Sequence, residues 1–223
     1  MATTVIAPAE PLEDPLAYLP CSRILEYSKR QVIYDQDHPP SSLSLIIEGK
    51  VKVSRTSQSG QQVVVDIYHA DEFFGETAFL ARRTTQEDAV ALEPTKVMSW
   101  SRDAITEIIG REPKLGVALL QLFAQRSMEF GERLESFSVD NIARRLARNL
   151  IRFGERLGQD GEGGTLQMMP FTHELLSQVV GTSREIVTHY MNQFRRQGYL
   201  QYSRRGIFIY RDALREWLRQ AAV

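Results

Sequence analysis

The stretch FTHELLSQVVGTSREIVTHYMNQFRRQGYL, residues 171–200, decides the fold of this chain. Its first half has apolar residues at helical spacing, and Gly181 then breaks the helix and makes a tight turn. A second helix with its own apolar face follows. The apolar residues of the first helix are Leu175, Leu176, Val179 and Val180, and those of the second are Ile186, Val187, Tyr190, Met191 and Phe194. The stretch therefore predicts a helix-turn-helix.

The second predicted helix has a polar side. Arg184, Glu185, Thr188 and His189 lie opposite its apolar residues. An Arg and short polar side chains near the N-terminus of the second helix are the groups with which helix-turn-helix proteins read base edges in the major groove. We therefore predict that these four residues read bases.

Other polar residues beside this side are candidate phosphate contacts, which position a protein on DNA without reading sequence. Thr182 or Ser183 is also expected to cap the second helix, and Thr182-x-x-Glu185 fits a capping box that would compete with base reading by Glu185. Two strand-like segments, residues 199–202 and 207–210, predict a hairpin wing with two Arg at its tip. The candidate phosphate contacts are Thr172, Thr182, Ser183, Gln193, Arg204 and Arg205.

Charge is distributed unevenly along the chain. Residues 141–223 contain 13 Arg, no Lys and 7 acidic residues, a net charge of +6. Because the whole chain has 27 basic and 28 acidic residues, residues 1–140 contain 14 and 21, a net charge of −7. The basic half is the half with the helix-turn-helix, as phosphate neutralisation requires. The alternative is that the two halves only have different solvated surfaces.

Short alternating segments between residues 43 and 100 predict a small antiparallel β-roll or barrel. Leu43, Leu45 and Ile47 are expected on its buried face. Glu48-Gly49 is predicted to be the turn of a hairpin that continues into residues 51–53. Further strands are predicted near residues 63–67, 87–92 and 96–100.

A long helix is predicted after Pro113, a residue that suits the first turn of a helix. Along it, apolar and small residues step by three and four, which is a heptad seam. Such a seam predicts a homodimer, and the alternative is that it packs on its own roll. The seam residues are Leu120, Phe123, Ser127, Phe130, Leu134 and Phe137.

These segments predict an α+β fold in three parts. Residues 1–110 would form a proline-containing arm and the β-roll, residues 111–139 the dimerisation helix, and residues 140–223 the winged helix-turn-helix domain. Ser138, Val139 and Asp140 are predicted to interrupt the long helix as a hinge, with Asp140 as the N-cap of a helix over residues 141–157.

Several function classes are not expected. Cys21 is the only cysteine, which excludes a disulfide framework, a cysteine zinc site and a four-thiolate iron-sulfur cluster. No metal site is predicted. No apolar run approaches the roughly 18 residues of a membrane span, so a cytoplasmic protein without a membrane partner is expected. The chain has no phosphate-cradling glycine loop, metal-spaced His cluster or nucleophile motif, so it is not expected to be an enzyme.

The order of roll, long helix, hinge and winged helix-turn-helix resembles the Crp/Fnr family of bacterial transcription regulators. The resemblance covers nearly everything after about residue 20, and no single piece of it is decisive. Its most specific pieces are EGKVKV at 48–53, DEFFGE at 71–76, NL at 149–150 and VGTSRE at 180–185. It implies a homodimer on double-stranded DNA, RNA polymerase as a further partner, Arg184 and Glu185 as base readers, and an effector pocket in the roll.

The implied pocket departs from that of cyclic-AMP binders. Those members follow their Gly-Glu pair with Arg and Ser or Thr that hold the cyclic phosphate, whereas here that position is Gln86-Glu87, with Arg82 and Arg83 too early. A carboxylate is electrostatically unfavourable beside a phosphate, and Phe130 replaces an adenine-contacting Thr or Ser. Usual cyclic AMP binding is therefore not predicted. The candidate pocket residues are Gly75, Glu76, Thr77, Gln86, Glu87 and Phe130.

Other sensing branches fit no better. The haem-ligating His of the carbon-monoxide-sensing branch follows its Phe-Phe pair, where this chain has Gly75-Glu76-Thr77, and His69 is the only local His. Haem is therefore not expected, and no cofactor is predicted. The alternative function is a ligand-binding sensor, for a cyclic nucleotide, haem or another small molecule, whose output is not DNA binding. That alternative leaves the +6 half unexplained.

Overall fold

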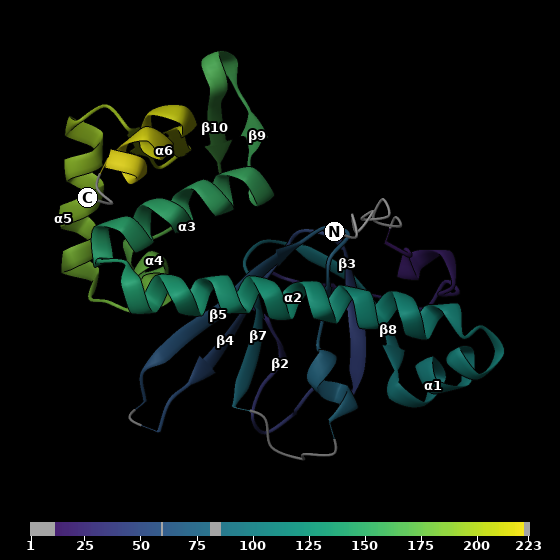
Figure 1. Cartoon of the computed structure of the whole chain (residues 1–223). Helices are drawn as coiled ribbons and strands as arrows, with labels where there is room; N and C mark the ends of the chain where they lie inside the picture. The colour runs from purple at the N-terminus through teal and green to yellow at the C-terminus, as the bar shows by residue number, and fades with distance from the viewer. Residues whose placement is uncertain (1–11, 59, 81–85, 221–223) are drawn as a thin grey trace, which may run out of the picture.

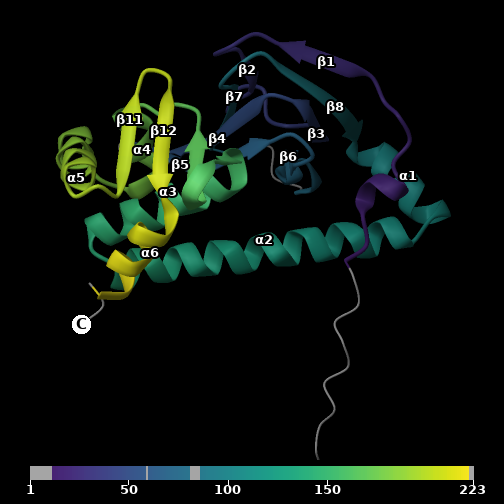
Figure 2. The same cartoon turned by 90° about the horizontal axis from the view of Figure 1, so that it is seen from above.

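The structure, a computed structural model, describes residues 12–58, 60–80 and 86–220. Within them, a β-roll, the long helix α2 (Lys114–Val139) and a C-terminal domain follow one another along the chain. Figures 1 and 2 show α2 running beside the roll and the C-terminal domain packed at the far end of α2. The predicted α+β class is confirmed. Most of the predicted N-terminal arm lies outside the described residues, as do Arg82 and Arg83.

The roll consists of two four-stranded antiparallel sheets with an apolar core between them. One sheet has the order β1 (Ile24–Tyr27), β8 (Thr95–Ser101), β3 (Ser42–Glu48) and β6 (Phe73–Phe74). The other has the order β2 (Val32–Tyr34), β7 (Glu87–Ala91), β4 (Lys50–Thr56) and β5 (Gln62–His69). The predicted small antiparallel roll is therefore present.

Strand β3 is buried on both faces, which the alternating pattern did not predict. Leu43 and Leu45 pack against α1 (Arg102–Arg111) and α2, while Ile46 belongs to the core between the sheets. Ile47, expected on the buried face, is 38% exposed. The covering helices bury the outer face of the sheet, so burial continues from Leu43 to Ile46.

The hairpin predicted at Glu48-Gly49 is wrong. Strand β3 pairs with β8 and β6, whereas β4 pairs with β5 and β7, so the chain passes from one sheet to the other at this point. Gly49 has φ 97°, and a Cβ there would lie 2.6 Å from the carbonyl oxygen of Pro94. Glycine is therefore required at a corner between sheets rather than at a hairpin turn.

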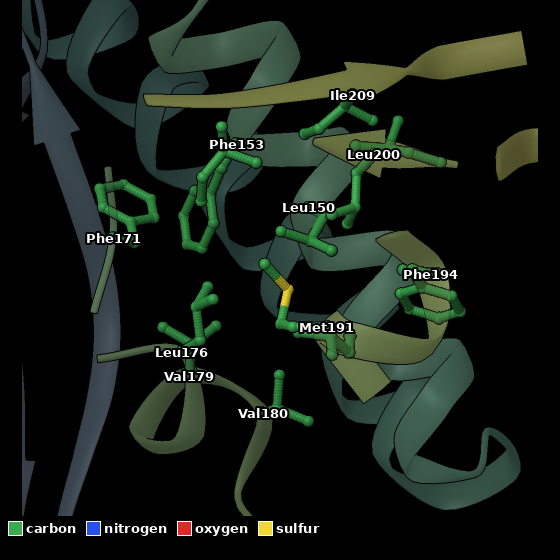
Figure 3. Close-up of a cluster of buried hydrophobic side chains, with 14 of the residues drawn as sticks. Leu150, Phe153, Phe171, Leu176, Val179, Val180, Met191, Phe194, Leu200 and Ile209 are labelled. Carbon is green, nitrogen blue, oxygen red and sulfur yellow. The ribbon is translucent and has the colours of Figure 1, made fainter. Parts of the chain in front are cut away.

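The C-terminal domain is built on α3 (Ile142–Leu157) and one apolar cluster (Figure 3). Its sheet has the order β11 (Leu200–Ser203), β12 (Gly206–Tyr210), β10 (Thr165–Met168) and β9 (Gln159–Asp160). Its other helices are α4 (His173–Val180), α5 (Arg184–Arg196) and α6 (Arg211–Gln220). The labelled side chains of α3, α4 and α5 in Figure 3 point toward one another, so the helix-turn-helix and the wing share one core.

The junction between α2 and α3 differs from the prediction. Ser138 and Val139 are the last residues of α2, and Asp140 is its C-cap. Asn141, not Asp140, caps α3, because Asn141 Oδ1 accepts from the backbone N–H of Arg144 at 3.0 Å. The Asp140 carboxylate accepts instead from Ser136 Oγ (2.7 Å), Arg144 Nε (2.8 Å) and Arg148 Nε (2.6 Å). Asp140 thus ties the end of α2 to the first turns of α3.

Candidate nucleic-acid interface and effector site

The turn between α4 and α5 is formed by Gly181, which has φ 72°. The Oγ1 atom of Thr172 accepts from the backbone N–H of Leu175 at 3.0 Å and caps α4. The Oγ atom of Ser183 accepts from the backbone N–H of Ile186 at 3.4 Å and caps α5. The predicted capping box between Thr182 and Glu185 is wrong, because Ser183 is the N-cap and Glu185 is only the second residue of α5.

The polar side of α5 is open to solvent. Arg184, Glu185 and His189 are exposed, and Thr188 is half-buried. The pKa of Glu185 is lowered by its own backbone N–H and then by the Ser183 hydroxyl. Glu185 is thus a carboxylate at the N-terminus of a helix, where the helix dipole favours negative charge. Its carboxylate is exposed to solvent and is hydrogen-bonded to the Ser183 hydroxyl.

Three residues that sequence reasoning missed hold this side in place. His173 Nδ1 lies 2.8 Å from Thr188 Oγ1, and the Tyr202 hydroxyl donates to Asn192 Oδ1 at 3.0 Å. The His173 and Tyr202 rings meet edge to face at 5.4 Å. The pKa of His173 is lowered by burial and by the nearby Arg184 charge. The position of Asn192, four residues after Thr188, could have suggested a shared helix face, but its contact with the wing could not be predicted from spacing.

The predicted wing is present as the hairpin of β11 and β12. Arg204 and Arg205 are both exposed at its tip. Thr172 is exposed, while Thr182 and Gln193 are half-buried on the helix-turn-helix. The domain thus presents exposed guanidinium and hydroxyl groups, which are the usual donors to phosphate oxygens.

The heptad seam of α2 is largely open in the single chain. Leu120 is 70% exposed and Leu134 is 69% exposed, while Phe130 and Phe137 are 38% and 42% exposed. Ser127 is also exposed, and Phe123 is half-buried against the cluster that covers the roll. The residues of α2 that the roll buries are different ones, namely Leu115, Ala118 and Leu119.

The candidate effector residues lie in two places. Gly75, with φ 84°, precedes a short 3-10 helix over Glu76–Phe79. Thr77 Oγ1 donates to Glu87 Oε2 at 3.1 Å, so these two residues do meet. Gln86 is exposed immediately before Glu87. Phe130 lies elsewhere, on α2, with the Arg133 guanidinium 4.3 Å from its ring centre.

Charged and aromatic side chains lie beside Glu76 and Glu87. The Arg126 side chain on α2, 12% exposed, pairs with Glu76 at 3.2 Å, lies 4.8 Å from the Tyr68 ring centre and donates to the Phe73 carbonyl. Glu87 is 8% exposed, and Arg55 lies 3.3 Å from its carboxylate. Burial raises the pKa of Glu87. Glu87 is therefore a buried carboxyl group on β7 that contacts both Thr77 and Arg55.

Two further findings concern other kinds of site. Among the described residues, no helix is long and apolar enough to cross a membrane. In the same part of the chain, no group of three or more His, Cys, Asp and Glu side chains could hold a metal ion.

Comparisons with known proteins match both parts of the chain. Residues 24–112 match the family model of the cyclic nucleotide-binding domain, and residues 144–217 match that of the Crp-like helix-turn-helix domain. The chain belongs to the Crp/Fnr family. It is accordingly a DNA-binding transcription regulator and not an enzyme.

Two curated relatives and one solved structure illustrate the likeness within the Crp/Fnr family. The "CRP-like cAMP-activated global transcriptional regulator" of Mycobacterium tuberculosis is 25% identical over 186 residues, which is 83% of each chain. The "Cyclic AMP receptor protein" of Thermus thermophilus is 28% identical over 172 residues, 77% of this chain and 76% of the relative. The structure of FixK2 from Bradyrhizobium japonicum, 18% identical, matches with a TM-score of 0.75 and covers 87% of this chain and 96% of its own, which supports the fold.

Proposed function

We propose that this protein binds a palindromic promoter site in double-stranded DNA as a homodimer and regulates transcription there. The observation that carries the proposal is the open polar side of α5, with Arg184 and Glu185 exposed in its first turn. Arg184 is suited to a bidentate contact with guanine, and Glu185 to accepting from cytosine N4. Thr188 and His189 follow on the same side. Thr172, Thr182, Ser183, Gln193, Arg204 and Arg205 are proposed to contact phosphates.

The open seam of α2 supports pairing with a second copy of the chain. Helix-turn-helix dimers place their two recognition helices in successive major grooves, with half-sites about one helical turn apart. In this arrangement residues 1–110 form the sensor part, residues 111–139 the dimerisation helix and residues 140–223 the DNA-binding part. Ser138, Val139 and Asp140 at the end of α2 form the proposed hinge, RNA polymerase is a proposed partner, and the protein acts in the cytoplasm.

The roll of this chain is proposed not to bind cyclic AMP in the usual way. Buried Glu87 and the ion pair of Arg126 with Glu76 place charged groups of the chain itself in the candidate effector region. Neither carboxyl group can neutralise the charge of a phosphate, and Arg126 is already paired with Glu76. Neither haem nor an iron-sulfur cluster is proposed. Isothermal titration calorimetry with cyclic AMP is expected to give no heat of binding, and a micromolar affinity would contradict this part of the proposal.

Selection of bound fragments from random duplex DNA, followed by gel shifts, tests the main proposal. A sequence related to itself by two-fold symmetry should be enriched, and its affinity should fall steeply with salt because counterions are released. Enrichment without any common sequence would leave only non-specific binding. No retention of DNA at low salt would favour the alternative, a ligand-binding sensor without a DNA output.

A further inference from the structure

A buried carboxylate joins the roll to the DNA-binding domain. Asp66 on β5 is 4% exposed and faces three guanidinium groups. Arg156 Nη1 lies 3.0 Å and Arg152 Nη1 3.4 Å from its Oδ1 atom, and Arg133 Nη2 lies 3.8 Å from Oδ2. Arg133 comes from α2, whereas Arg152 and Arg156 come from α3. One side chain of the roll thus contacts both of the other parts of the molecule.

Glu72 extends the contact. Arg156 uses its second terminal nitrogen to pair with Glu72 Oε1 at 2.8 Å, so its planar fork spans two carboxylates of the roll. Arginine forks have a fixed geometry and therefore fix orientation as well as distance. The two carboxylates hold α3 at a defined angle to β5.

Apolar packing surrounds this cluster of charges. Val64 and Ile67 of β5 belong to the same buried cluster as Phe171 and Val179 of the DNA-binding domain. Figure 1 shows α4 beside β5, and in Figure 3 Phe171 lies at the edge of the cluster. Apolar attraction is not itself directional, whereas an arginine fork has a fixed geometry. The charged cluster is therefore the part of this contact that specifies orientation.

Charge balance makes Asp66 the central member. Burial acts to raise the pKa of Asp66, but Arg152, Arg156 and Arg133 outweigh it and hold the pKa below its usual value. Without its charge, three guanidinium groups would face one another with Glu72 and the nearby Glu129 left to balance them. Removing one partner of a buried ionic group leaves the others uncompensated. The docked arrangement would then lose its main electrostatic tie.

We infer that Asp66 is a positioning residue that sets the orientation of the DNA-binding domain on the roll and α2, and thereby the spacing of half-sites that the dimer accepts. This inference rests on the proposed function. In a dimer joined along α2, each recognition helix is placed by the docking of its own domain. The distance between the two recognition helices determines the spacing of half-sites that the dimer can bind. A DNA-binding domain that is held less firmly should therefore allow binding to a wider range of spacings.

The test compares Asp66→Asn with Asp71→Asn, a control on an exposed carboxylate in the turn that follows β5. The DNA is the site selected by the wild-type protein, remade with one base pair added or removed between its half-sites. For wild type and control, the altered spacing should raise Kd by about fivefold or more, the scale of coupling between linked sites. Asp66→Asn should show a clearly smaller rise. Without DNA, small-angle scattering should give a larger radius of gyration for Asp66→Asn alone.

The remaining outcomes are also decisive. An Asp66→Asn protein with the wild-type scattering curve and spacing preference would overturn the inference. If Asp66→Asn does not fold, Arg156→Gln replaces it in the test, because it breaks the same cluster from the DNA-binding domain. If neither variant folds, the cluster is needed for folding rather than for positioning, and the inference is overturned. If wild type bound no DNA, the proposed function would fail, while scattering would still decide whether Asp66 holds the domain.

Discussion

The Nδ1 atom of His173 lies 2.8 Å from Oγ1 of Thr188 and joins the two helices of the helix-turn-helix. The Thr188 hydroxyl also donates to the carbonyl oxygen of Arg184 at 2.8 Å. Its one proton is therefore used, and His173 Nδ1–H donates to the oxygen. The hydroxyl therefore has no proton left to donate to DNA, and in the proposed base contact of Thr188 we expect its methyl group to meet the base.

Thr188→Val and Thr188→Ala separate these roles. Valine keeps the methyl group but leaves the His173 N–H without an acceptor, so the free energy of unfolding should fall by about 1 kcal/mol while base preference stays the same. Alanine also removes the methyl, and any preference for a thymine at that position should weaken. Urea unfolding and competition binding measure the two effects. An altered base preference in Thr188→Val would show instead that the hydroxyl reads a base.

Arg184→Ala should weaken binding to the selected site by about 1–3 kcal/mol and relax specificity at one base pair of each half-site. The reason is that Arg184 is exposed in the first turn of α5, where a guanidinium can reach the edge of a guanine. Arg204→Ala at the wing tip is the matched comparison. It should weaken binding to specific and random DNA alike and reduce the salt slope by about 1. Equal losses on both kinds of DNA for Arg184→Ala would contradict base reading.

The sequence was enough to predict those elements that residues close together in the chain determine. Helical periodicity and Gly181 were enough for the helix-turn-helix, because a left-handed glycine ends α4 whatever packs around it. The position of Arg204 and Arg205 at the wing tip could be predicted because short strands flank them in the sequence. Alternation of apolar and polar residues likewise predicted several strands of the roll, namely β3, β4, β5, β7 and β8. These features depend on residues that are near one another in the chain.

The errors arose where distant parts of the chain decide the structure. Glycine at position 49 fits a hairpin and a corner between sheets equally well, and only the pairing of β3 with β8 separates them. Asp140 is a good N-cap by type, but the guanidinium groups of Arg144 and Arg148 draw its carboxylate away. Asp66 showed no local signal, because its partners lie on α2 and α3.

Leu134→Glu should dissociate the proposed dimer. The Leu134 side chain is 69% exposed on the seam of the single chain. Burying a leucine in an interface stabilises it by about 1.5–3 kcal/mol, whereas burying an unpaired carboxylate destabilises it, and the substitution is present in both copies. Met128→Glu is the control, since Met128 is 71% exposed on α2 but lies off the seam. Sedimentation equilibrium should give a monomer for the first and a dimer for the second. A dimeric Leu134→Glu protein would place the interface elsewhere.

Asp140→Asn should destabilise the protein in a pH-dependent way. Burial acts to raise the pKa of Asp140, but hydrogen bonds from Arg144, Ser136 and Arg148 outweigh it and lower the pKa. A carboxylate whose pKa is lowered by folding stabilises the protein at pH values above its pKa in the unfolded chain, about 3.9. This stabilisation is lost as the pH falls through the lower pKa of the folded protein. Near pH 7 the loss for Asp140→Asn should be about 3 kcal/mol, as for a broken buried ion pair.

The measurement is urea unfolding of wild type and Asp140→Asn across the acid range. The difference in unfolding free energy should be full near neutral pH and should shrink as pH falls below about 4, because the wild-type carboxylate then becomes neutral as well. Asp103→Asn is the control, since its side chain is 91% exposed, and it should change stability little at any pH. A difference for Asp140→Asn that stays constant down to the acid limit would mean that shape, rather than charge, holds the junction of α2 and α3.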